Sequence, residues 1–416
     1  MAQQAAATRP RVVIVGAGFG GLAAARALAH AHVDVVVIDA KNHHTFQPLL
    51  YQVATAALSP ASIAWPIRHL LKTQANAQVL MSRVVSVDPA VRQVLSESGP
   101  TDYDQLVIAA GAAHSYFGQD GWEPFAPGLK TLEDALDIRR RILSAFERAE
   151  LAGKDKAPPR LTTFVVVGGG PTGVELAGAI AEIARDALKS EFRHIDPAAS
   201  RIVLVEAGPR ILPTFPDPLA ADAARRLACY GVEVMTGTKV IDIDADGVTL
   251  EHGRIAAATV LWAAGVRAAP LLASLPGEHD RAGRARVGPD LSLAGYPDIF
   301  VIGDGAVPDG PPLPGIAPAA KQMGAYVGHL IARRLSGRPP PPPFRYRHEG
   351  DLATIGRGAA VVRIGPVRLT GFVGWLFWGC VHIYFLIGLR ARFFVALDWL
   401  WSYATYQRGA RLITGE

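Results

Sequence analysis

The sequence predicts an α/β fold with two similar units, each built on a buried parallel sheet, followed by an apolar and Arg-rich C-terminal region. Residues 11–39 contain a strand, a glycine-rich turn, a helix and a second strand that ends in an acidic residue. The same order returns in residues 161–206. From residue 331 onward, aromatic side chains cluster among twelve Arg and no Lys. This repeated order is typical of Rossmann-like dinucleotide-binding domains.

The length and the charge distribution limit the function classes. With 416 residues, the chain is too long for one ordinary core and should hold two or three domains. Half of the residues are hydrophobic, which suggests that something apolar is bound. The net charge is +5, yet the residues from 331 onward carry twelve Arg against four acidic residues, a net of +8. A basic, aromatic-rich tail favours an anionic membrane surface over nucleic acid, and the chain shows no nucleic-acid module.

The first motif is the glycine-rich turn in RVVIVGAGFGG. Gly16 permits the tight turn, Gly18 lets the backbone approach a pyrophosphate, and Gly21 lets a helix over about residues 22–31 lie close to the sheet. Asp39, at the end of the next strand, is placed to accept a hydrogen bond from a ribose hydroxyl. These residues predict a dinucleotide site; the alternative is a glycine-rich turn without a ligand.

Two further segments belong to the first unit. The loop that contains Lys41 and Gln47 leads into the apolar residues 49–51, and it either lies near a bound ring or forms a plain surface loop. A buried strand ends in Ala-Ala-Gly at Gly111, where small residues allow close approach to a cofactor or simply tight packing. A later strand carries Asp304 at its tip, well suited to bind a polar part of a dinucleotide.

The second motif repeats the first. Gly168, Gly170 and Gly173 precede a helix expected over 174–187, and a strand ends at Glu206. Two such motifs predict two dinucleotides, with a second unit that serves only as scaffold as the alternative. The carboxylate of Glu206 pairs with a 2′-hydroxyl and repels a 2′-phosphate, which favours NADH, although Arg210 is close enough in sequence to accommodate NADPH.

A glutamate and a helix start are further candidate site elements. Glu175 follows Gly173 at the start of the second helix, where it is either an ordinary first-turn acid or a group beside a nicotinamide. A helix expected from residue 317 contains Lys321 and Gln322, and its N-terminus could stabilise an anion on a reduced flavin. Ordinary helix-surface roles for Lys321 and Gln322 are the alternative.

The C-terminal region holds two apolar segments, residues 369–389 and 393–406. Glycines interrupt the first segment. The second contains Trp and Tyr and is bracketed by Arg, a composition that suits helices lying in a membrane interface. A membrane-spanning helix and a hydrophobic dimer interface remain alternatives. The two cysteines, Cys229 and Cys380, are far apart in sequence, which favours a reducing compartment without a redox disulfide. The first ten residues lack an apolar run of signal-peptide length, so we expect a cytoplasmic location.

The chain resembles the two-dinucleotide flavoproteins and, more closely, the type II NADH dehydrogenases, which are single-chain NADH:quinone oxidoreductases. The resemblance runs nearly from end to end and is carried by GAGFGG (16–21), FQPLLYQVATAALSP (46–60), GGGPTGVE (168–175), VLVEAGPRIL (203–212), WAAGV (262–266), GDGA (303–306) and the Trp-rich tail. The loop at 46–60 and the tail are its specific parts.

The resemblance implies two cofactors, hydride transfer from NADH to FAD, and electron transfer from there to a membrane quinone without proton pumping. It implies FAD at Gly16, Gly18, Gly21, Asp39, Lys41, Gln47, Gly111 and Asp304, and NADH at Gly168, Gly170, Gly173, Glu206 and Gly265. Glu175 matches the family's glutamate near the nicotinamide and flavin, and Gln322 matches the second glutamine of its quinone motif AQxAxQ. Here the motif reads APAAKQ, so Pro318 replaces the first glutamine and Lys321 or Gln322 would take its place. No metal and no nucleophilic Ser or Cys are expected.

Three domains are expected: an FAD domain (1–118 and 275–337), an NADH domain with a connecting helix (119–274) and a membrane-associating region (338–416). The chain would act in the respiratory chain as a homodimer, peripheral to the cytoplasmic face of the inner membrane and bound to anionic lipid. A soluble NAD(P)H-dependent reductase of a small redox protein and a non-catalytic NADH-binding redox sensor are the alternatives. A sulfide:quinone reductase is disfavoured because no matching cysteine pair is present.

Overall fold

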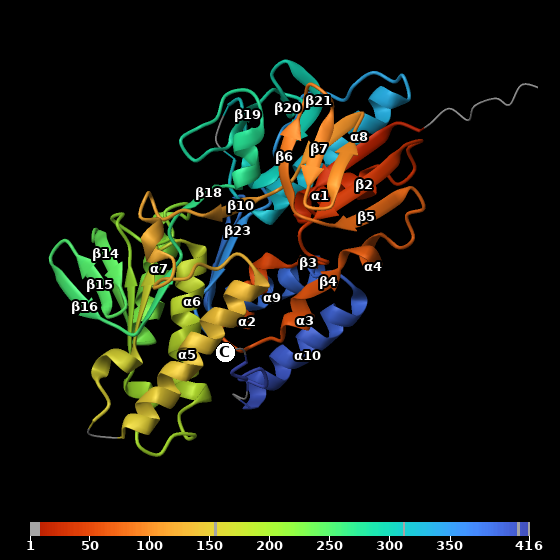
Figure 1. Ribbon diagram of the computed structural model, residues 1–416. Helices are drawn as coiled ribbons and strands as arrows, with labels where there is room; N and C mark the ends of the chain where they lie inside the picture. The colour runs from red at the N-terminus through yellow and green to blue at the C-terminus, as the bar shows by residue number, and fades with distance from the viewer. Residues whose placement is uncertain (1–8, 154–155, 311–312, 406–407, 415–416) are drawn as a thin grey trace, which may run out of the picture. The chain divides into compact units, whose positions relative to one another are not determined.

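The computed structural model describes residues 9–153, 156–310, 313–405 and 408–414 (Figure 1). Two compact units share the chain. The first consists of Met1–His44, Trp65–Ala113 and Val266–His348, and the second of Thr45–Ala64, His114–Gly265 and Glu349–Glu416. Most of the C-terminal region therefore packs within the second unit. The three functional domains expected from the sequence stay a prediction.

The first unit is built on an eight-stranded sheet in the order β22-β19-β20-β21-β9-β1-β2-β5. Its central strands are parallel neighbours, with β1 between β9 and β2. They are runs of Val, Ile and Leu, and these side chains are buried in the core of the unit. The strands are β1 (Arg11–Val15), β2 (Asp34–Asp39), β5 (Ala77–Met81), β9 (Gln105–Ile108), β19 (Ala285–Val287), β20 (Ser292–Leu293), β21 (Tyr296–Val301) and β22 (Ala306–Pro308).

Helices α1 (Phe19–Ala27) and α8 (Ala317–Leu335) pack against each other in this unit. A Cβ at Gly324 would lie 2.0 Å from the carbonyl oxygen of Gly20, so glycine is needed where the two helices meet. The helix expected over 22–31 was wrong in its bounds, because the extended backbone of Gly18 ends the turn directly before Phe19. The other elements are α4 (Ile67–Leu71) and the antiparallel sheet of β6 (Val84–Asp88), β7 (Gln93–Ser96) and β8 (Gly99–Asp102).

The second unit repeats the parallel sheet in the order β13-β12-β11-β17. A separate antiparallel sheet, β14-β15-β16, lies in the same unit (Figure 1). The helix expected over 174–187 begins earlier, at Pro171, and passes into a π-helical turn at Ile183–Ala187. The elements are α5 (Leu132–Ala152), β11 (Thr163–Val167), α6 (Pro171–Glu182), β12 (Arg201–Val205), α7 (Asp217–Cys229), β13 (Val232–Met235), β14 (Val240–Asp244), β15 (Gly247–Leu250), β16 (Gly253–Ala256) and β17 (Thr259–Trp262).

The C-terminal part of the second unit contains a small sheet that the sequence did not predict. This sheet, β23 (Asp351–Thr354), β24 (Ala360–Ile364) and β25 (Val367–Thr370), is followed by α9 (Gly371–Phe385) and α10 (Leu389–Thr405). A Cβ at Gly374 would lie 2.6 Å from the carbonyl oxygen of Ala360, so glycine lets α9 rest on β24. Tyr406, the end of the expected second apolar segment, lies outside the described residues.

Short elements complete the fold. Helices α2 (Leu50–Ala54) and α3 (Pro60–Ile63) belong to the second unit, and four short strands stand where the chain passes from one unit to the other: β3 (His43–Thr45), β4 (Ala64–Pro66), β10 (Ala112–His114) and β18 (Val266–Ala268). Among the described residues, every helix is too short or too polar to cross a bilayer.

Candidate active site

The first glycine turn forms an anion cradle at the carboxyl end of β1. Gly16 has a φ of +97°, and a Cβ at Gly21 would lie 1.8 Å from the carbonyl oxygen of Gly16. A Cβ at Gly18 would meet no atom within 4 Å. Gly18 is also the N-cap of α1, and it provides no side-chain cap. Gly16 and Gly21 are therefore required by the fold, whereas Gly18 leaves open space at a helix N-terminus, where a pyrophosphate fits.

The second glycine turn has the same geometry. Gly168 has a φ of +111°, and a Cβ at Gly173 would again lie 1.8 Å from the carbonyl oxygen of Gly168. A Cβ at Gly170, the N-cap of α6, would meet nothing within 4 Å. Both turns thus leave open space at the N-terminus of a helix, which is where the phosphates of a dinucleotide would bind.

Each turn is braced by the acidic residue at the end of the second strand. Asp39 accepts hydrogen bonds from the amides of Ala17 (2.6 Å) and Lys41 (2.8 Å). Glu206 accepts them from the amides of Gly169 and Gly208, both at 2.6 Å. Lys41 therefore contributes its backbone to this brace. The carboxylates lie beside the turns, which is the position that a ribose recognition role requires.

The guanidinium of Arg210 is engaged elsewhere. It donates to the carbonyl oxygens of Phe215 and Pro213 and pairs with Asp217 at 2.9 Å. These contacts hold it within its own loop. The expected roles of Arg210 and Glu206 in the choice between NADH and NADPH stay predictions.

The two Ala-Ala-Gly segments end in the same backbone conformation. Gly111 has a φ of +72° and Gly265 a φ of +79°, a region that favours glycine. A Cβ at Gly265 would overlap the ring of Phe117 at 2.5 Å, whereas one at Gly111 would meet nothing within 4 Å. Gly111 thus leaves space beside the sheet edge, and Gly265 serves packing in its own unit.

Asp304 lines a cavity of about 250 Å³ in the first unit. The cavity lies between the end of β21 and the N-terminal turns of α8, where Ala319, Ala320 and Met323 form one wall. Lys321 and Gln322 are not among its lining residues. Lys321 is exposed, while the Gln322 amide donates to the carbonyl oxygen of Arg347 (2.9 Å) and accepts from its N–H (3.0 Å). The quinone roles expected for Lys321 and Gln322 stay predictions.

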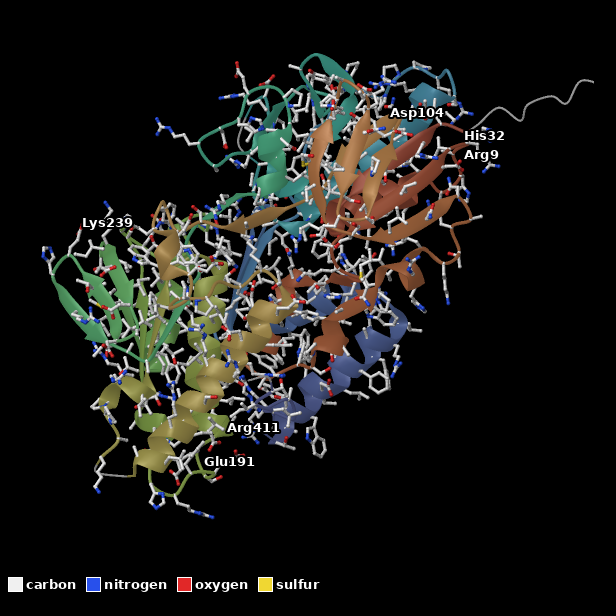
Figure 2. All side chains as sticks on the ribbon, viewed as in Figure 1. Arg9, His32, Asp104, Glu191, Lys239 and Arg411 are labelled. Atoms are coloured by element: carbon white, nitrogen blue, oxygen red, sulfur yellow. The ribbon has the colours of Figure 1, made fainter. Side chains whose placement is uncertain are left out.

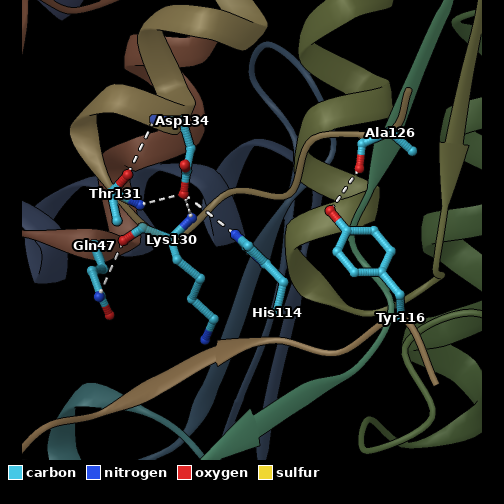
Figure 3. Close-up of polar contacts among 7 residues, drawn as sticks. All are labelled: Gln47, His114, Tyr116, Ala126, Lys130, Thr131 and Asp134. Carbon is cyan, nitrogen blue, oxygen red and sulfur yellow. Dashed lines mark hydrogen bonds and ion pairs between the residues drawn. The ribbon is translucent and has the colours of Figure 1, made fainter. Parts of the chain in front are cut away.

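Gln47 lies in a polar network of the second unit (Figure 3). Its amide nitrogen is 3.4 Å from the carbonyl oxygen of Lys130. Asp134 accepts from the amides of Lys130 and Thr131, both at 2.9 Å, and Thr131 caps α5 in return. Gln47 is thus tied to the start of α5, and its expected contact with FAD stays a prediction.

Glu175 lies in the second unit against β23. The amide of Thr354 is 3.4 Å from its Oε1, and burial raises the pKa of Glu175 from 4.5 to about 8. The carboxyl group is therefore largely protonated at neutral pH. The ring of Tyr51 lies nearby, and its hydroxyl is 2.9 Å from the Oγ1 of Thr354. Burial also raises the pKa of Tyr51, which stays neutral.

Several polar residues around Glu175 were not found from the sequence. Trp399 donates to the Gln52 side-chain oxygen at 2.7 Å, and Gln52 donates to the Tyr51 hydroxyl at 3.0 Å. Arg408 is buried and pairs with Glu182 at 2.8 Å. The one sequence signal was the spacing of Glu175 and Glu182, seven positions apart on one helix, which places both acids on the same face.

Comparisons with known proteins agree with this geometry. Residues 10–324 match the family model described as pyridine nucleotide-disulphide oxidoreductase, and residues 348–405 match that of the NDH2 C-terminal domain. Two curated relatives from Mycobacterium tuberculosis are similar over nearly the whole chain. The type II NADH:quinone oxidoreductase Ndh is 45% identical, covering 98% of this chain and 91% of the relative. The type II NADH:quinone oxidoreductase NdhA is 42% identical, covering 98% of this chain and 90% of the relative.

A solved structure shares the fold. The structure of NDH2 from Plasmodium falciparum in complex with NADH matches with a TM-score of 0.86 at 21% identity, covering 98% of this chain and 100% of the other. The two Rossmann-like units and the C-terminal region predicted from the sequence are thereby confirmed as a fold.

Proposed function

Since the chain belongs to the pyridine nucleotide-disulphide oxidoreductase family and, within it, to the type II NADH:quinone oxidoreductases, we propose that it transfers a hydride from NADH to FAD and passes the electrons to a quinone. The observation that carries the proposal is the duplicated cradle. The chain has two turns of the same geometry. Each combines a glycine that leaves open space, Gly18 or Gly170, with a carboxylate that accepts a turn amide, Asp39 or Glu206. A reaction between two dinucleotides requires both.

In this proposal FAD occupies the first unit. The turn at Gly18 would hold its pyrophosphate, Asp39 its ribose, and Asp304 with the space at Gly111 the parts nearer the ring. When bound, the isoalloxazine supplies the hydride acceptor and the electron donor. Lys41 and Gln47 would contribute through the loops that they order. The protein's own contribution is positioning and electrostatics.

NADH would occupy the second unit, with its pyrophosphate at Gly170 and its adenosine ribose at Glu206. The carboxylate of Glu206 already accepts hydrogen bonds from two backbone amides, which hold it in place. A 2′-phosphate at this place would meet like charge, so NADH is preferred over NADPH. Glu175, mostly protonated, would stand beside the nicotinamide as a proton donor.

The quinone and the membrane involve the C-terminal helices. Large apolar residues of α9 and α10 are exposed: Phe372, Val373, Leu376, Tyr384, Phe385, Leu389, Phe393, Phe394, Leu397, Leu400, Trp401 and Tyr403. We propose that this surface, called the apolar hairpin face, lies on the cytoplasmic leaflet of the inner membrane, with nearby Arg side chains on anionic lipid. We also propose that Lys321 and Gln322, in the first unit, contact the quinone headgroup. Electron transfer proceeds without proton pumping, and the chain acts as a homodimer.

The proposed function is tested by steady-state kinetics with the FAD-loaded protein. NADH oxidation is followed with a short-chain quinone, with a ferredoxin-type protein and without an acceptor, and the series is repeated with NADPH. We expect turnover with the quinone and NADH, and little with the other combinations. Turnover with the redox protein but not with any quinone would favour a soluble reductase instead.

A further inference from the structure

A small polar cavity in the second unit reaches Glu175. This cavity, called the chamber, has a volume of about 70 Å³. Its polar lining includes Tyr51, Glu175, Glu182 and Arg408, and Trp378 belongs to its aromatic lining. A water molecule needs about 10–15 Å³ of such volume, so the chamber has room for several water molecules.

Trp378, one of the lining residues of the chamber, carries a buried N–H group. Its side chain is 1% exposed, and its Nε1–H finds no acceptor among the described residues. The ring is held in place, since it stacks on His382 at 4.2 Å and the Trp378 carbonyl oxygen is 2.8 Å from the His382 Nδ1. Buried N–H groups in native proteins nearly always have a partner, and ordered water supplies it where protein does not.

The chamber joins two carboxyl groups of α6. Glu175 and Glu182 both line it, and seven residues of helix separate them by about 10 Å along the axis. A rise of this length along the backbone leaves room between the two side chains for a chain of two or three water molecules at about 2.8 Å spacing. The side chain of Glu182 is 16% exposed, so this end of the chamber touches solvent.

We propose that the chamber holds a chain of water molecules that carries protons from solvent, past Glu182, to the carboxyl group of Glu175. The inference rests on the proposed function, whose net reaction, NADH + H⁺ + quinone → NAD⁺ + quinol, takes up one solvent proton per turnover. Glu175 gives its O–H proton toward the reacting centre, and its carboxylate then takes a proton from the nearest water. Each water passes on one proton and receives one, and solvent replaces it at Glu182.

The charges around the chamber agree with proton movement from Glu182 toward Glu175. Burial keeps the pKa of Glu175 near 8, so the carboxylate takes up a proton again at neutral pH. Glu182 is paired with Arg408, whose side chain is 4% exposed and also donates to the carbonyl oxygen of Thr55 at 2.7 Å. The Arg357 guanidinium lies 4.4 Å from the centre of the Tyr403 ring, and Tyr51 stays neutral. The positive charge of Arg408 thus stands at the outer carboxylate, Glu182.

The test uses three variants of the full-length, FAD-loaded protein. Glu182→Gln keeps an acceptor for Arg408 but cannot take up a proton. Trp378→Phe keeps the ring but removes the buried N–H. Ala179→Leu fills the chamber from the turn of α6 between the two acids, where Ala179 lines it. Two variants outside the chamber serve as controls. Glu191→Gln alters a similar surface pair, with Arg411 at 2.6 Å (Figure 2). Trp122→Phe removes an indole N–H that is bonded to Asp242 at 3.0 Å.

Proton uptake is followed with a pH dye after the anaerobically reduced protein is mixed with a short-chain quinone. We expect each chamber variant to take up protons about tenfold more slowly than the wild-type protein, with the controls unchanged. Reduction of the protein-bound flavin by NADH should keep its rate in all variants, because hydride transfer needs no solvent proton. Circular dichroism establishes that each variant is folded.

A crystal structure gives a second readout that does not depend on activity. Water oxygens within hydrogen-bond distance of the Trp378 Nε1 and between Glu175 and Glu182 are expected. A dry chamber, or unchanged proton uptake in all three folded variants, would overturn the proposal. A wild-type protein that the quinone does not reoxidise would instead overturn the proposed function.

Discussion

Asp39 and Glu206 hold equivalent places in their two units, and each carboxylate accepts two backbone amides, one of them from the glycine turn. The internal repeat thus extends from the sequence motif to individual hydrogen bonds. The ribose and phosphates of a dinucleotide would approach the glycine turn beside this carboxylate. The same carboxylate could therefore hold the turn in shape and contact the ribose.

Neutralising Asp39 and neutralising Glu206 should have different effects, because we expect them to bind different cofactors. Asp39→Asn should lower the flavin content of the purified protein, measured by absorbance. Glu206→Gln should leave flavin content unchanged and raise the KM for NADH about tenfold, the effect of ~1.4 kcal/mol. It should also bring the kcat/KM for NADPH closer to that for NADH. An unchanged preference between the two nucleotides would contradict the assignment of Glu206.

Two glycines of the second turn should respond differently to alanine. Gly170→Ala should fold with an unchanged Tm, because its Cβ meets open space, but it should raise the KM for NADH by crowding the pyrophosphate. Gly173→Ala should lose about 3 kcal/mol of stability, because its Cβ overlaps a carbonyl oxygen. Thermal unfolding and NADH kinetics measure the two effects. Equal effects of both substitutions on Tm would contradict the open space at Gly170.

The raised pKa of Glu175 predicts a specific pH dependence of stability. Between 4.5 and about 8, folded Glu175 keeps a proton that the unfolded chain has released, so the free energy of unfolding falls as pH rises. Glu175→Gln removes the ionisable group and with it this pH dependence. We expect the variant and the wild-type protein to be equally stable near pH 4.5, and the variant to be more stable above about pH 8. Urea unfolding across this pH range measures both stabilities, and parallel stability curves would contradict the raised pKa of Glu175.

Charged residues on the apolar hairpin face should weaken membrane binding. Phe393→Asp with Leu400→Asp places two carboxylates on a surface that we expect to contact lipid. Cosedimentation with anionic vesicles should fall at least about tenfold. Ile241→Asp, at an exposed apolar residue of β14, is the matched control and should bind as the wild-type protein does. Equal loss in the control would mean that charge alone, and not this face, determines binding.

The effects of alanine variants on the KM for quinone and on Tm can distinguish quinone-binding roles of Lys321 and Gln322 from structural ones. Lys321→Ala should raise the KM for quinone with little change in Tm, since the side chain is exposed. Gln322→Ala should raise the same KM and also lower Tm by the loss of two hydrogen bonds to Arg347, about 1 kcal/mol each. A lower Tm with unchanged quinone KM would make Gln322 a purely structural residue.

The features that depend on neighbouring residues were predictable from the sequence. The two glycine turns and the strand before the first of them follow from local steric and hydrogen-bonding rules, and they were placed correctly. The strand before the second turn begins at Thr163, two residues later than expected. Helix ends were less predictable, since α1 and α6 begin where an extended glycine ends the turn, three residues before their expected starts.

The surroundings of Glu175 could not be predicted. Its contact with Thr354 joins residues 179 positions apart, and Thr354 lies in a sheet with no clear alternation of apolar residues. The buried Arg408 read as one more basic residue of the tail, because its partner Glu182 is distant in the sequence. Long-range pairing of this kind depends on the complete fold.

The central claim is tested most directly by anaerobic double mixing of the FAD-loaded protein. NADH is added first, the flavin absorbance is followed, and a short-chain quinone is added once the NADH is consumed. The proposed function predicts rapid bleaching by NADH and rapid recovery of the yellow colour with the quinone. A protein that binds no flavin on reconstitution, or whose reduced flavin is not reoxidised by any quinone, would contradict it.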